Sequence, residues 1–492
     1  MTREQIQEKL ITLFAGETGL ARESLNLAAP IAGYGLDSVA VASVLGDVET
    51  WSGKRIDPGL MWKQPSIAAI VDHLADTPAQ SDDALTKATP LPGLAELESR
   101  FEALADAQVA DPFFRTFEGL GADTIGATDG PLINFASYNY LGLAGDPKVR
   151  QAAREAIDRY GTSVSASRLS AGERPLHRDL ERALARLSET QDALVFVGGY
   201  ATNVSVIGHL YSGADLIAYD SSMHNSAVTG ARLSGARCLA FPHNDTQALD
   251  ELLTRERAAH RRVLVLAEGV YSTNGDIPDL GELVRVKKKH AAWLMIDEAH
   301  SIGVLGPRGR GLADHWGMKE HQIDIVMGTL SKALASCGGY VAGSADLIRY
   351  LRYTCPGFIF SAGISPPNAA AALKAAEILE AEPGRAAGLR HNAQTLIRLA
   401  RARGLDTGSS QGSGVVPIMV GDDLRAMRLS NELFSKGVNV QPLVTPAVEA
   451  DGARLRFFLS SLHTHEQIET AMDLTAALLP SVALSNDRRA AR

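Results

Sequence analysis

The stretch Gly328-Thr329-Leu330-Ser331-Lys332 follows a short β-branched and apolar run, residues 323–327, that is typical of a buried strand. Lys332 therefore comes just after the C-terminal end of that strand, where catalytic groups of open α/β sheets collect. A lysine amine with its solution pKa of about 10.4 is mostly protonated, so a nucleophilic lysine needs a sheltered apolar or cationic setting. The small neighbours would give Lys332 access to a ligand. Alone, the motif also fits an ordinary solvated lysine.

A second apolar run, residues 291–296, ends in Asp297-Glu298-Ala299-His300. A buried carboxylate at the strand end can pair with a protonated pyridine nitrogen and keep it charged. In enzymes that use pyridoxal phosphate (PLP), a lysine holds the aldehyde and an aspartate holds the ring nitrogen, so Lys332 and Asp297 must lie on neighbouring strands. His300 could reach the phenolic oxygen of the ring. Helicases also contain D-E-A-H, but the chain has no Gly-rich G-K-[ST] loop for a nucleotide.

Two further predicted strand ends supply the remaining parts of such a cofactor site. Residues 192–197 predict a strand, and Gly198-Gly199-Tyr200 predicts a tight turn into a helix whose free N–H groups can hold a phosphate. Residues 216–219 predict another strand, after which His224 could stack on the cofactor ring. A single histidine after a strand is more often structural. The order of all four elements favours a functional role here.

With these motifs in this order, residues 93 to about 480 resemble the α-oxoamine synthases, a family of fold-type I PLP-dependent enzymes. The family includes serine palmitoyltransferase, aminooxononanoate synthase, aminolevulinate synthase and aminoketobutyrate ligase. The resemblance runs through N-Y-L-G-L at 139–143, S-R-L-S-A-G at 167–172, P-L-H at 175–177, G-Y-A-T-N at 199–203, E-G-V-Y-S at 268–272, D-E-A-H-S-I-G-V-L-G at 297–306, G-T-L-S-K at 328–332 and R-L-R-F at 454–457. The runs from His224 and Cys337 are most similar to the sphingolipid branch. The implied fold class is α/β, with a mostly parallel sheet in a large domain and a small α+β C-terminal domain.

The resemblance also implies roles for single residues. The catalytic residues would be Lys332, His224, Asp297 and His300. The other cofactor contacts would come from Gly199, Tyr200, Ser272 and Thr329, and from Ser361 of a second subunit. Arg456, rather than Arg454, would clamp the amino acid carboxylate through a bidentate fork, with help from Asn139; either arginine could instead cap the sheet surface. A shared site implies a homodimer. No metal site is implied.

The implied reaction is a decarboxylative Claisen condensation of a small amino acid with an acyl thioester, which gives an α-amino ketone, CO2 and a free thiol. Lys332 would take the Cα proton, and the cofactor ring held by Asp297 would absorb the resulting charge. The sphingolipid-like runs and the crowding by Arg456 and Asn139 suggest serine, alanine or glycine. Three alternatives stay open: a PLP aminotransferase or aldolase of the same fold, a degenerate scaffold, and a synthase that uses free acyl-CoA. Intact Lys332, Asp297 and His300 argue against the scaffold.

The N-terminal residues differ from this pattern. Ile6, Leu10, Leu13 and Phe14 recur at helical spacing, and Gly35-Leu36-Asp37-Ser38 opens a second predicted helix. A hydroxyl at a helix N-terminus could be a simple cap, but the helix dipole also favours a phosphodiester there. This region resembles an acyl carrier protein over its full length, a small all-α helix bundle. The resemblance implies 4'-phosphopantetheine on Ser38, and a phosphopantetheinyl transferase and an acyl-loading enzyme as partners.

Composition and spacing then suggest the domain limits. We expect a carrier domain at 1–76, a linker at 77–92, an N-terminal segment with the large PLP-binding domain at 93–375, a small C-terminal domain at 376–485, and a disordered tail at 486–492. With 45% hydrophobic and 21% charged residues, the chain of 492 residues has the composition of an ordinary globular protein.

Charge and cysteine content bear on partners and compartment. The formal net charge of -9 argues against nucleic acid as a partner. The one basic cluster, Arg285 and Lys287 to Lys289, is expected to form a solvated helix face. The three cysteines have no paired spacing and suit a reducing cytoplasm. Neither a signal peptide nor a membrane-spanning run is predicted.

Overall fold

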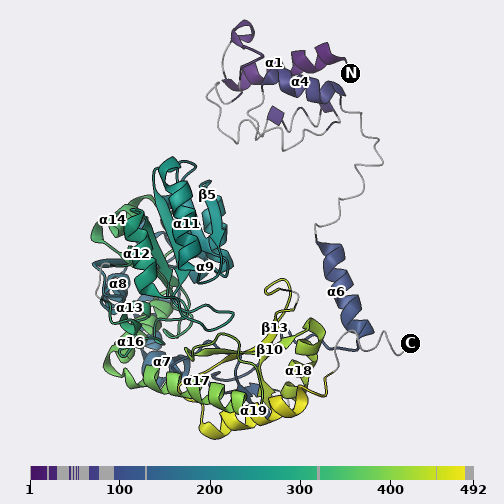
Figure 1. Cartoon of the computed structure of the whole chain (residues 1–492). Coiled ribbons are helices and arrows are strands. Elements are labelled where there is room, and N and C mark those ends of the chain that lie inside the picture. Colours follow the sequence, from purple (N-terminus) through teal and green to yellow (C-terminus); the bar gives the residue numbers. More distant parts are fainter. Residues whose placement is uncertain are drawn as a thin grey trace. The chain divides into compact units, whose positions relative to one another are not determined.

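The computed structural model describes residues 2–18, 21–29, 31, 44–45, 48, 51–52, 54, 66–76, 93–127, 130–318, 322–449 and 451–482 (Figure 1). Ser38, the predicted 77–92 linker and the predicted 486–492 tail lie outside these ranges. By its contacts the chain divides into two compact units, Met1–Arg100 and Phe101–Arg492.

The longer described elements are as follows. The helices are α1 (Arg3–Thr18), α4 (Ile67–Asp76), α6 (Leu94–Asp106), α7 (Pro147–Tyr160), α8 (Pro175–Leu187), α9 (Gly199–Leu210), α10 (Asn225–Leu233), α11 (Thr246–Glu256), α12 (Leu280–Lys289), α13 (Leu312–His315), α14 (Ala345–Thr354), α15 (Pro356–Ile359), α16 (Pro366–Ala381), α17 (Gly384–Ala402), α18 (Asp423–Ser435) and α19 (His465–Leu478). The strands are β1 (Thr124–Ala127), β2 (Gly130–Asn134), β3 (Asp192–Phe196), β4 (Leu216–Asp220), β5 (Arg237–Phe241), β6 (Val263–Glu268), β7 (Trp293–Asp297), β8 (Ile325–Thr329), β9 (Gly339–Gly343), β10 (Val415–Gly421), β11 (Val438–Asn439), β12 (Gln441–Leu443) and β13 (Ala453–Phe458).

The first unit contains the predicted N-terminal helix. Ile6, Leu10 and Phe14 recur every four residues on α1, and all three are fully buried. They share one apolar cluster with residues of α4, among them Ile70 and Leu74. The helical spacing read from the sequence is therefore confirmed for α1.

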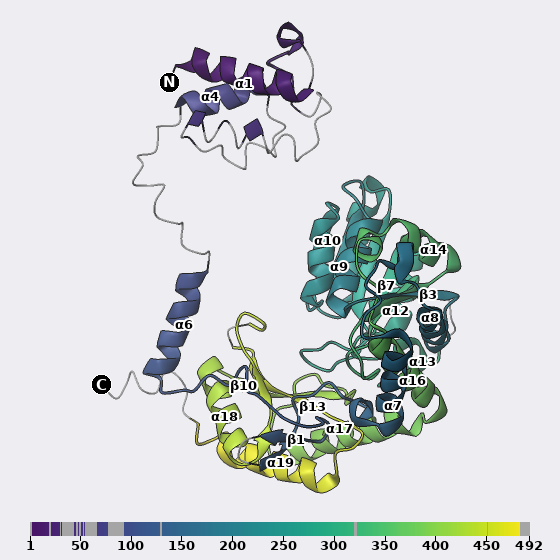
Figure 2. The ribbon, with the colours of Figure 1, turned by 180° about the vertical axis from the view of Figure 1, so that it is seen from behind.

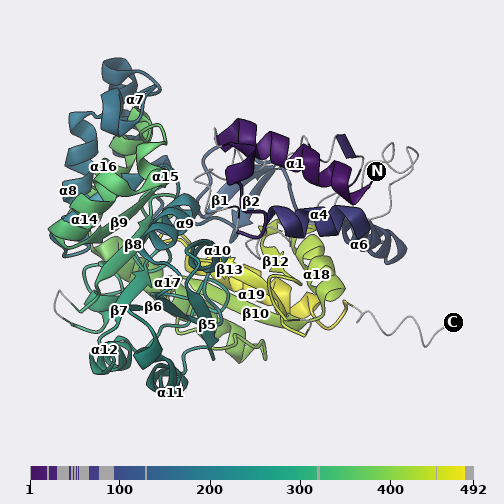
Figure 3. The ribbon, with the colours of Figure 1, turned by 90° about the horizontal axis from the view of Figure 1, so that it is seen from above.

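A seven-stranded sheet forms the centre of the second unit, with the strand order β3-β9-β8-β7-β6-β4-β5. Strands β5, β4, β6, β7 and β8 pair in parallel, whereas β9 is antiparallel to both of its neighbours. Seen from above, β5 to β9 run side by side (Figure 3). The predicted mostly parallel sheet is confirmed, and the carboxyl ends of its parallel strands meet at one edge.

Helices cover both faces of this sheet. Successive strand residues point to opposite faces, so Leu194 joins an apolar cluster with residues of α9, α10 and α14, while Val195 joins the larger cluster that includes α8, α11, α12 and α16. Figure 1 shows the side with α11 and α12, and Figure 2, from behind, shows the side with α9 and α10. Because both faces are buried, these strands are continuous apolar runs.

A second, smaller group of strands lies in the C-terminal part. β10, β13 and β12 form an antiparallel sheet in that order, and α17 and α19 pack together beside it (Figure 1). The predicted strands at 415–420 and 455–460 correspond to β10 and β13, although β13 begins and ends two residues earlier.

The expected solvated basic face of α12 is wrong at one residue, Lys287. Arg285 and Lys289 of α12 are exposed and pair with Asp250, but Lys287 is 7% exposed and its Nζ lies 2.6 Å from Asp324 Oδ2. Lys287 thus contributes a buried ion pair rather than a solvated face.

No helix in the described part of the chain has the length and apolar character needed to cross a membrane.

Candidate active site

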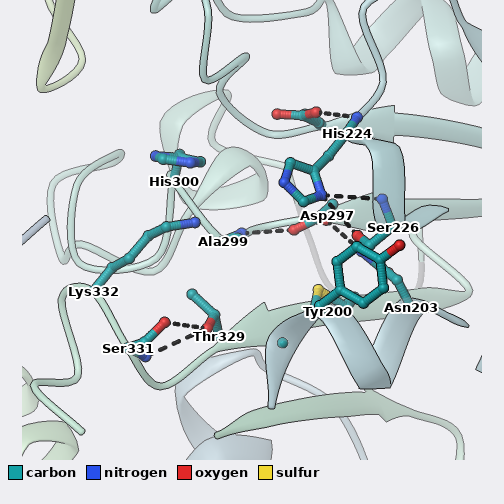
Figure 4. A pocket seen from close by; sticks show the side chains of 13 residues that line it. Tyr200, Asn203, His224, Ser226, Asp297, Ala299, His300, Thr329, Ser331 and Lys332 are labelled. Atoms are coloured by element: carbon teal, nitrogen blue, oxygen red, sulfur yellow. Dashed lines mark hydrogen bonds between the residues drawn. The ribbon is translucent and has the colours of Figure 1, made fainter. Parts of the chain in front are cut away.

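The carboxyl ends of β7 and β8 and the N-termini of α9 and α10 enclose a cavity of about 150 Å³ (Figure 4). Its lining includes the predicted residues Gly199, Tyr200, His224, Asp297, His300, Thr329 and Lys332. It also includes Asn203, Ser226, Glu268, Ala299, Met327 and Ser331. Seven residues from four separate motifs therefore meet in one place, as the order of strands predicted.

Asp297 is the last residue of β7 and is only 4% exposed. Its Oδ1 accepts a hydrogen bond from the Ala299 N–H at 2.9 Å, and its Oδ2 accepts one from Asn203 Nδ2 at 2.8 Å. These two donors stabilise a charged carboxylate inside the protein. Such a group is suited to hold a cationic ring nitrogen.

Lys332 follows the end of β8, the strand that pairs in parallel with β7. Its Nζ lies 5.7 Å from the ring centroid of Tyr138. Desolvation lowers the pKa of Lys332 to about 8, against the attraction of Asp297 and Glu268. A larger fraction of this amine is therefore uncharged near neutral pH than in a solvated lysine.

The two histidines are held in different ways. The Nδ1 of His300 lies 2.7 Å from the hydroxyl of Tyr140, and burial lowers the pKa of His300 well below its usual value. His224 is the N-cap of α10, and its backbone N–H donates to Glu268 Oε1 at 2.7 Å. Both imidazoles line the cavity. Both are therefore available as neutral hydrogen-bonding groups.

A candidate phosphate cradle lies where α9 begins. A Cβ on Gly199 would come within 2.8 Å of Thr329 Oγ1, so only glycine lets the helix start this close to β8. The Thr329 and Ser331 hydroxyls are 2.8 Å apart beside it. Free N–H groups at a helix N-terminus together with two hydroxyls suit a phosphate. With Lys332 and Asp297 on neighbouring strands, these residues fit PLP.

A second cavity, of about 770 Å³, shares His224, His300 and Lys332 with the first. Arg454, Arg456 and Ser272 line it, together with apolar residues such as Val448. Nη1 of Arg456 donates to the Ser272 carbonyl oxygen at 3.0 Å, and its guanidinium lies 4.7 Å from the ring centroid of Phe458. The predicted Arg456 and Ser272 thus lie together, beside the lysine.

Two predicted residues, Asn139 and Ser361, do not line these cavities. Asn139 is buried and bonded through its amide to the Gly121 carbonyl oxygen and the Ala144 N–H. Ser361 lines a separate small cavity beside Arg168. Ser38 is outside the described residues.

Some lining residues were not singled out from the sequence. Tyr138 precedes the N-Y-L-G-L motif, while Asn203 and Glu268 belong to the G-Y-A-T-N and E-G-V-Y-S motifs, which did not predict a role for either residue. The sequence signal for Glu268 was a polar residue at the end of a strand, and the signal for Asn203 was a polar residue near the start of a helix. Among the described residues, no cluster of His, Cys, Asp and Glu side chains could hold a metal ion.

Comparison with known proteins agrees with this geometry. The family model described as "Aminotransferase class I and II" matches residues 130–474, and the one described as "Phosphopantetheine attachment site" matches residues 8–74. The chain is 36% identical to 8-amino-7-oxononanoate synthase of Thermoanaerobacter pseudethanolicus, over 69% of this chain and 86% of that protein. It is also 36% identical to serine palmitoyltransferase of Bacteroides thetaiotaomicron, over 75% of this chain and 92% of that protein.

Among solved structures, serine palmitoyltransferase from S. paucimobilis with PLP and myriocin bound is similar, with a TM-score of 0.77 and 32% identity. The similarity covers 80% of this chain and 99% of that one. Family model, relatives, fold and cavity all agree, so the chain belongs to the α-oxoamine synthase family of PLP-dependent acyltransferases and carries a phosphopantetheine attachment domain before its catalytic part.

Proposed function

We propose that this enzyme condenses a small amino acid with an acyl thioester carried on Ser38, and releases an α-amino ketone, CO2 and the free thiol of the carrier. The observation that supports this best is that Lys332, His224 and His300 line both cavities at once. An amino acid near Lys332 and a thioester entering through the larger cavity would meet there. The other cavity residues would hold the cofactor and the amino acid around this meeting point.

PLP, when bound, supplies an electron sink for negative charge at the amino acid Cα. Asp297, fixed by Ala299 and Asn203, would hold the ring nitrogen as a cation. His300 would donate to the phenolic oxygen, and His224 would stack on the ring. Gly199, Tyr200, Thr329 and Ser272 would hold the cofactor's other polar groups.

Lys332 would hold the cofactor's aldehyde carbon in the resting enzyme and would move the Cα proton during turnover. Its pKa of about 8 keeps the amine close to the balance between its two protonation states near neutral pH. A proton-transfer group works best when its pKa is near the working pH. The lowered pKa thus supports this role.

Arg456 would bind the carboxylate of the amino acid before that group leaves as CO2. It is the better candidate because, within the described part of the chain, only one of its five N–H donors has a protein partner, the Ser272 carbonyl oxygen. Asn139 would assist indirectly, since its amide holds the loop that presents Tyr138. Serine, alanine and glycine remain the proposed amino acids.

We further propose a homodimer in which Ser361 contributes to the phosphate site of the second subunit. Within one chain Ser361 does not line the Lys332 cavity, which is consistent with a role across the interface. The three cysteines are unpaired, as suits a reducing cytoplasm.

The experiment is a product assay with the holo carrier loaded with an acyl group and each small amino acid labelled at its carboxyl carbon. Release of labelled CO2 together with an α-amino ketone is expected, and both should be lost in Lys332→Ala. Borohydride should attach the cofactor to the peptide that contains Lys332. Transamination without CO2 release, or labelling of another lysine, would contradict the proposal.

A further inference from the structure

A chain of hydrogen bonds joins Asp297 to His224 along the wall of the cavity (Figure 4). Asn203 Nδ2 donates to Asp297 Oδ2 at 2.8 Å and to Ser226 Oγ at 2.9 Å. Ser226 Oγ lies 2.7 Å from His224 Nδ1. Asn203 and Ser226 are each 1% exposed, so no solvent competes for these groups. The chain therefore links the carboxylate to the imidazole through two buried side chains.

The direction of each hydrogen bond follows from the carboxylate. An ionised carboxylate can only accept, so the Asn203 amide must turn its NH2 group toward Asp297. The second hydrogen of that NH2 group then points to Ser226 Oγ. Ser226 Oγ accepts it and keeps its own hydrogen for another acceptor. The nearest acceptor is His224 Nδ1.

A second donor also points to Nδ1 as an acceptor. The backbone N–H of Ser226 also donates to His224 Nδ1, at 3.3 Å, as part of the helix cap of α10. A protonated Nδ1 would clash with this N–H and with the Ser226 hydroxyl hydrogen. A neutral histidine that accepts at one nitrogen must carry its proton on the other.

We propose that Asn203 and Ser226 are positioning residues that hold His224 in the neutral form protonated at Nε2, with that N–H turned toward the cavities. Figure 4 shows one ring nitrogen facing Ser226 and the other facing the side of Lys332 and His300. His224 lines both cavities, so the Nε2–H can reach a ligand in either.

Two further observations support the neutral ring and its fixed position. The ring is open to the cavities on one side, yet desolvation lowers the pKa of His224 and the positive charges of Lys332 and Arg456 act in the same direction, against Asp297. The backbone N–H of His224 donates to Oε1 of the Glu268 carboxyl group at 2.7 Å. The backbone and Nδ1 are thus anchored separately, which leaves the ring little freedom to flip.

The chemical consequence rests on the proposed function. A fixed Nε2–H can donate to the carbonyl oxygen of the acyl thioester when the amino acid Cα attacks the carbonyl carbon and the oxygen gains negative charge. A donor that is already oriented costs no reorganisation at that moment. A histidine protonated at Nδ1 would instead present a lone pair to that oxygen and repel it.

The test uses the full-length holoenzyme labelled with [15N]histidine, whose ring nitrogens report the tautomer by NMR. His224→Asn identifies the His224 signals. We expect the wild-type ring to be protonated at Nε2, to become a mixture of tautomers in Ser226→Ala, and to return to the wild-type pattern in Ser226→Thr. Ser234→Ala is the matched control, because Ser234 caps the far end of α10 and its Oγ bonds only locally, to the Ala231 carbonyl oxygen and the Ala236 N–H. This variant should change neither spectrum nor rate.

Turnover provides an independent readout. In Ser226→Ala, kcat should fall roughly 10- to 100-fold with little change in KM for the amino acid. This is less than the roughly 10²–10⁴-fold that a whole proton-donating group contributes, because the imidazole is still present and only its orientation is lost. A wild-type ring protonated at Nδ1, or a Ser226→Ala spectrum identical to wild type, would overturn the assignment. Should Ser226→Ala fail to fold, the wild-type spectrum alone still decides which ring nitrogen of His224 carries the proton. The spectra test the tautomer even if the enzyme's reaction proves to be a different one.

Discussion

Arg454 and Arg456 lie two residues apart on β13 and line the same cavity, yet their side chains are engaged differently. Arg454 is 6% exposed, and it donates to the Gly452 carbonyl oxygen at 2.6 Å and to the Asn274 side chain. Arg456 is half-buried and donates only to the Ser272 carbonyl oxygen among the bonds described. Arg454 therefore fixes the neighbouring loops, and Arg456 has further N–H donors available for a ligand.

Conservative substitution should separate these two roles. Arg456→Lys keeps the charge but loses the planar fork, so the loss of one charge-assisted hydrogen bond, about 1.5–3 kcal/mol, should raise KM for the amino acid roughly 10- to 100-fold. Arg454→Lys should lower the melting temperature instead, with a smaller effect on KM. Steady-state kinetics and thermal unfolding measure both. Equal effects of the two variants on KM would contradict the assignment.

Glu268 predicts a specific dependence of stability on pH. Burial, and then the neighbouring Asp297, raise the pKa of Glu268 from 4.5 to about 8. A carboxyl group with a raised pKa in the folded state stabilises the fold fully below about pH 4.5, and this contribution is lost as the pH rises toward 8. From pH 6 to pH 8 the loss would be about 2–3 kcal/mol, at about 1.4 kcal/mol per pH unit.

Glu268→Gln cannot ionise and should escape that loss. The difference in melting temperature between the apo forms of Glu268→Gln and wild type should therefore move in favour of the variant between pH 6 and pH 8.5. Glu98→Gln, at an exposed position of α6, is the control and should follow wild type. Parallel melting curves for Glu268→Gln and wild type at both pH values would show that Glu268 is already ionised at pH 6.

At the scale of elements, the start of α9 depends on a close approach to β8. A Cβ at position 199 would meet Thr329 Oγ1 at 2.8 Å and Thr329 Cβ at 3.1 Å, whereas a Cβ at position 198 would meet nothing within 4 Å. Gly198 also has an extended backbone, with φ of -164°, that any residue can adopt. Two adjacent glycines therefore offer a matched pair.

Gly199→Ala should push the helix N-terminus away from Thr329 and weaken PLP binding, by about tenfold or more for each 1.4 kcal/mol lost. Gly198→Ala should bind PLP nearly as wild type does. The measurement is PLP affinity by fluorescence titration of the apoenzyme. Comparable loss in both variants would mean that the second glycine is not required by this packing.

The elements that position the site could be predicted because each has a local signal. The apolar runs before Asp297 and Lys332 predicted β7 and β8. The roles of the lysine and the aspartate in PLP enzymes predicted that the two strands are neighbours, as the parallel pairing shows. Side-chain directions in loops carried no such signal. Of the adjacent residues Tyr138 and Asn139, the sequence pointed to Asn139, but Tyr138 faces the lysine. Likewise, the burial of Lys287 depends on Asp324, a partner 37 residues away.

At the scale of the whole molecule, exposed apolar side chains near the site suggest that a second protein surface covers them. Phe360, next to Ser361, is 83% exposed, and Tyr200 and Val197 at the start of α9 are also exposed. Side chains of this kind beside a catalytic cavity indicate a protein interface. We therefore expect a homodimer, with a mass about twice the 52.3 kDa of the chain, by light scattering.

Phe360→Arg should weaken this dimer, because it places a charge at the expected interface. Turnover should fall together with the dimeric fraction, and higher protein concentration should restore both. Tyr353→Arg, at another exposed aromatic residue within α14, is the comparison. A wild-type protein that remains monomeric at the concentration of full activity would contradict the shared site.

The domain limits at 76, 92, 375 and 485 remain predictions. A carrier joined to a catalytic unit can deliver an acyl group bound to Ser38. Tethering makes delivery intramolecular, with an effective concentration that can reach the millimolar range for a short linker. If residues 77–92 act as the linker that their composition predicts, a chain of that length spans roughly 20 Å on average. Free acyl-CoA would have to compete at that concentration.

We therefore expect Ser38→Ala to lose most turnover with acyl donors supplied through the carrier, while its PLP spectrum stays that of wild type because the catalytic cavity is unchanged. The comparison is between holo wild type, loaded enzymatically, and Ser38→Ala given the same acyl-CoA at physiological concentration. A separately expressed, loaded carrier should restore turnover to the variant, more weakly because the tether is gone. Equal rates of wild type and Ser38→Ala with acyl-CoA would instead mean that the thioester reaches Lys332 directly from solution, and that the N-terminal domain only docks a partner.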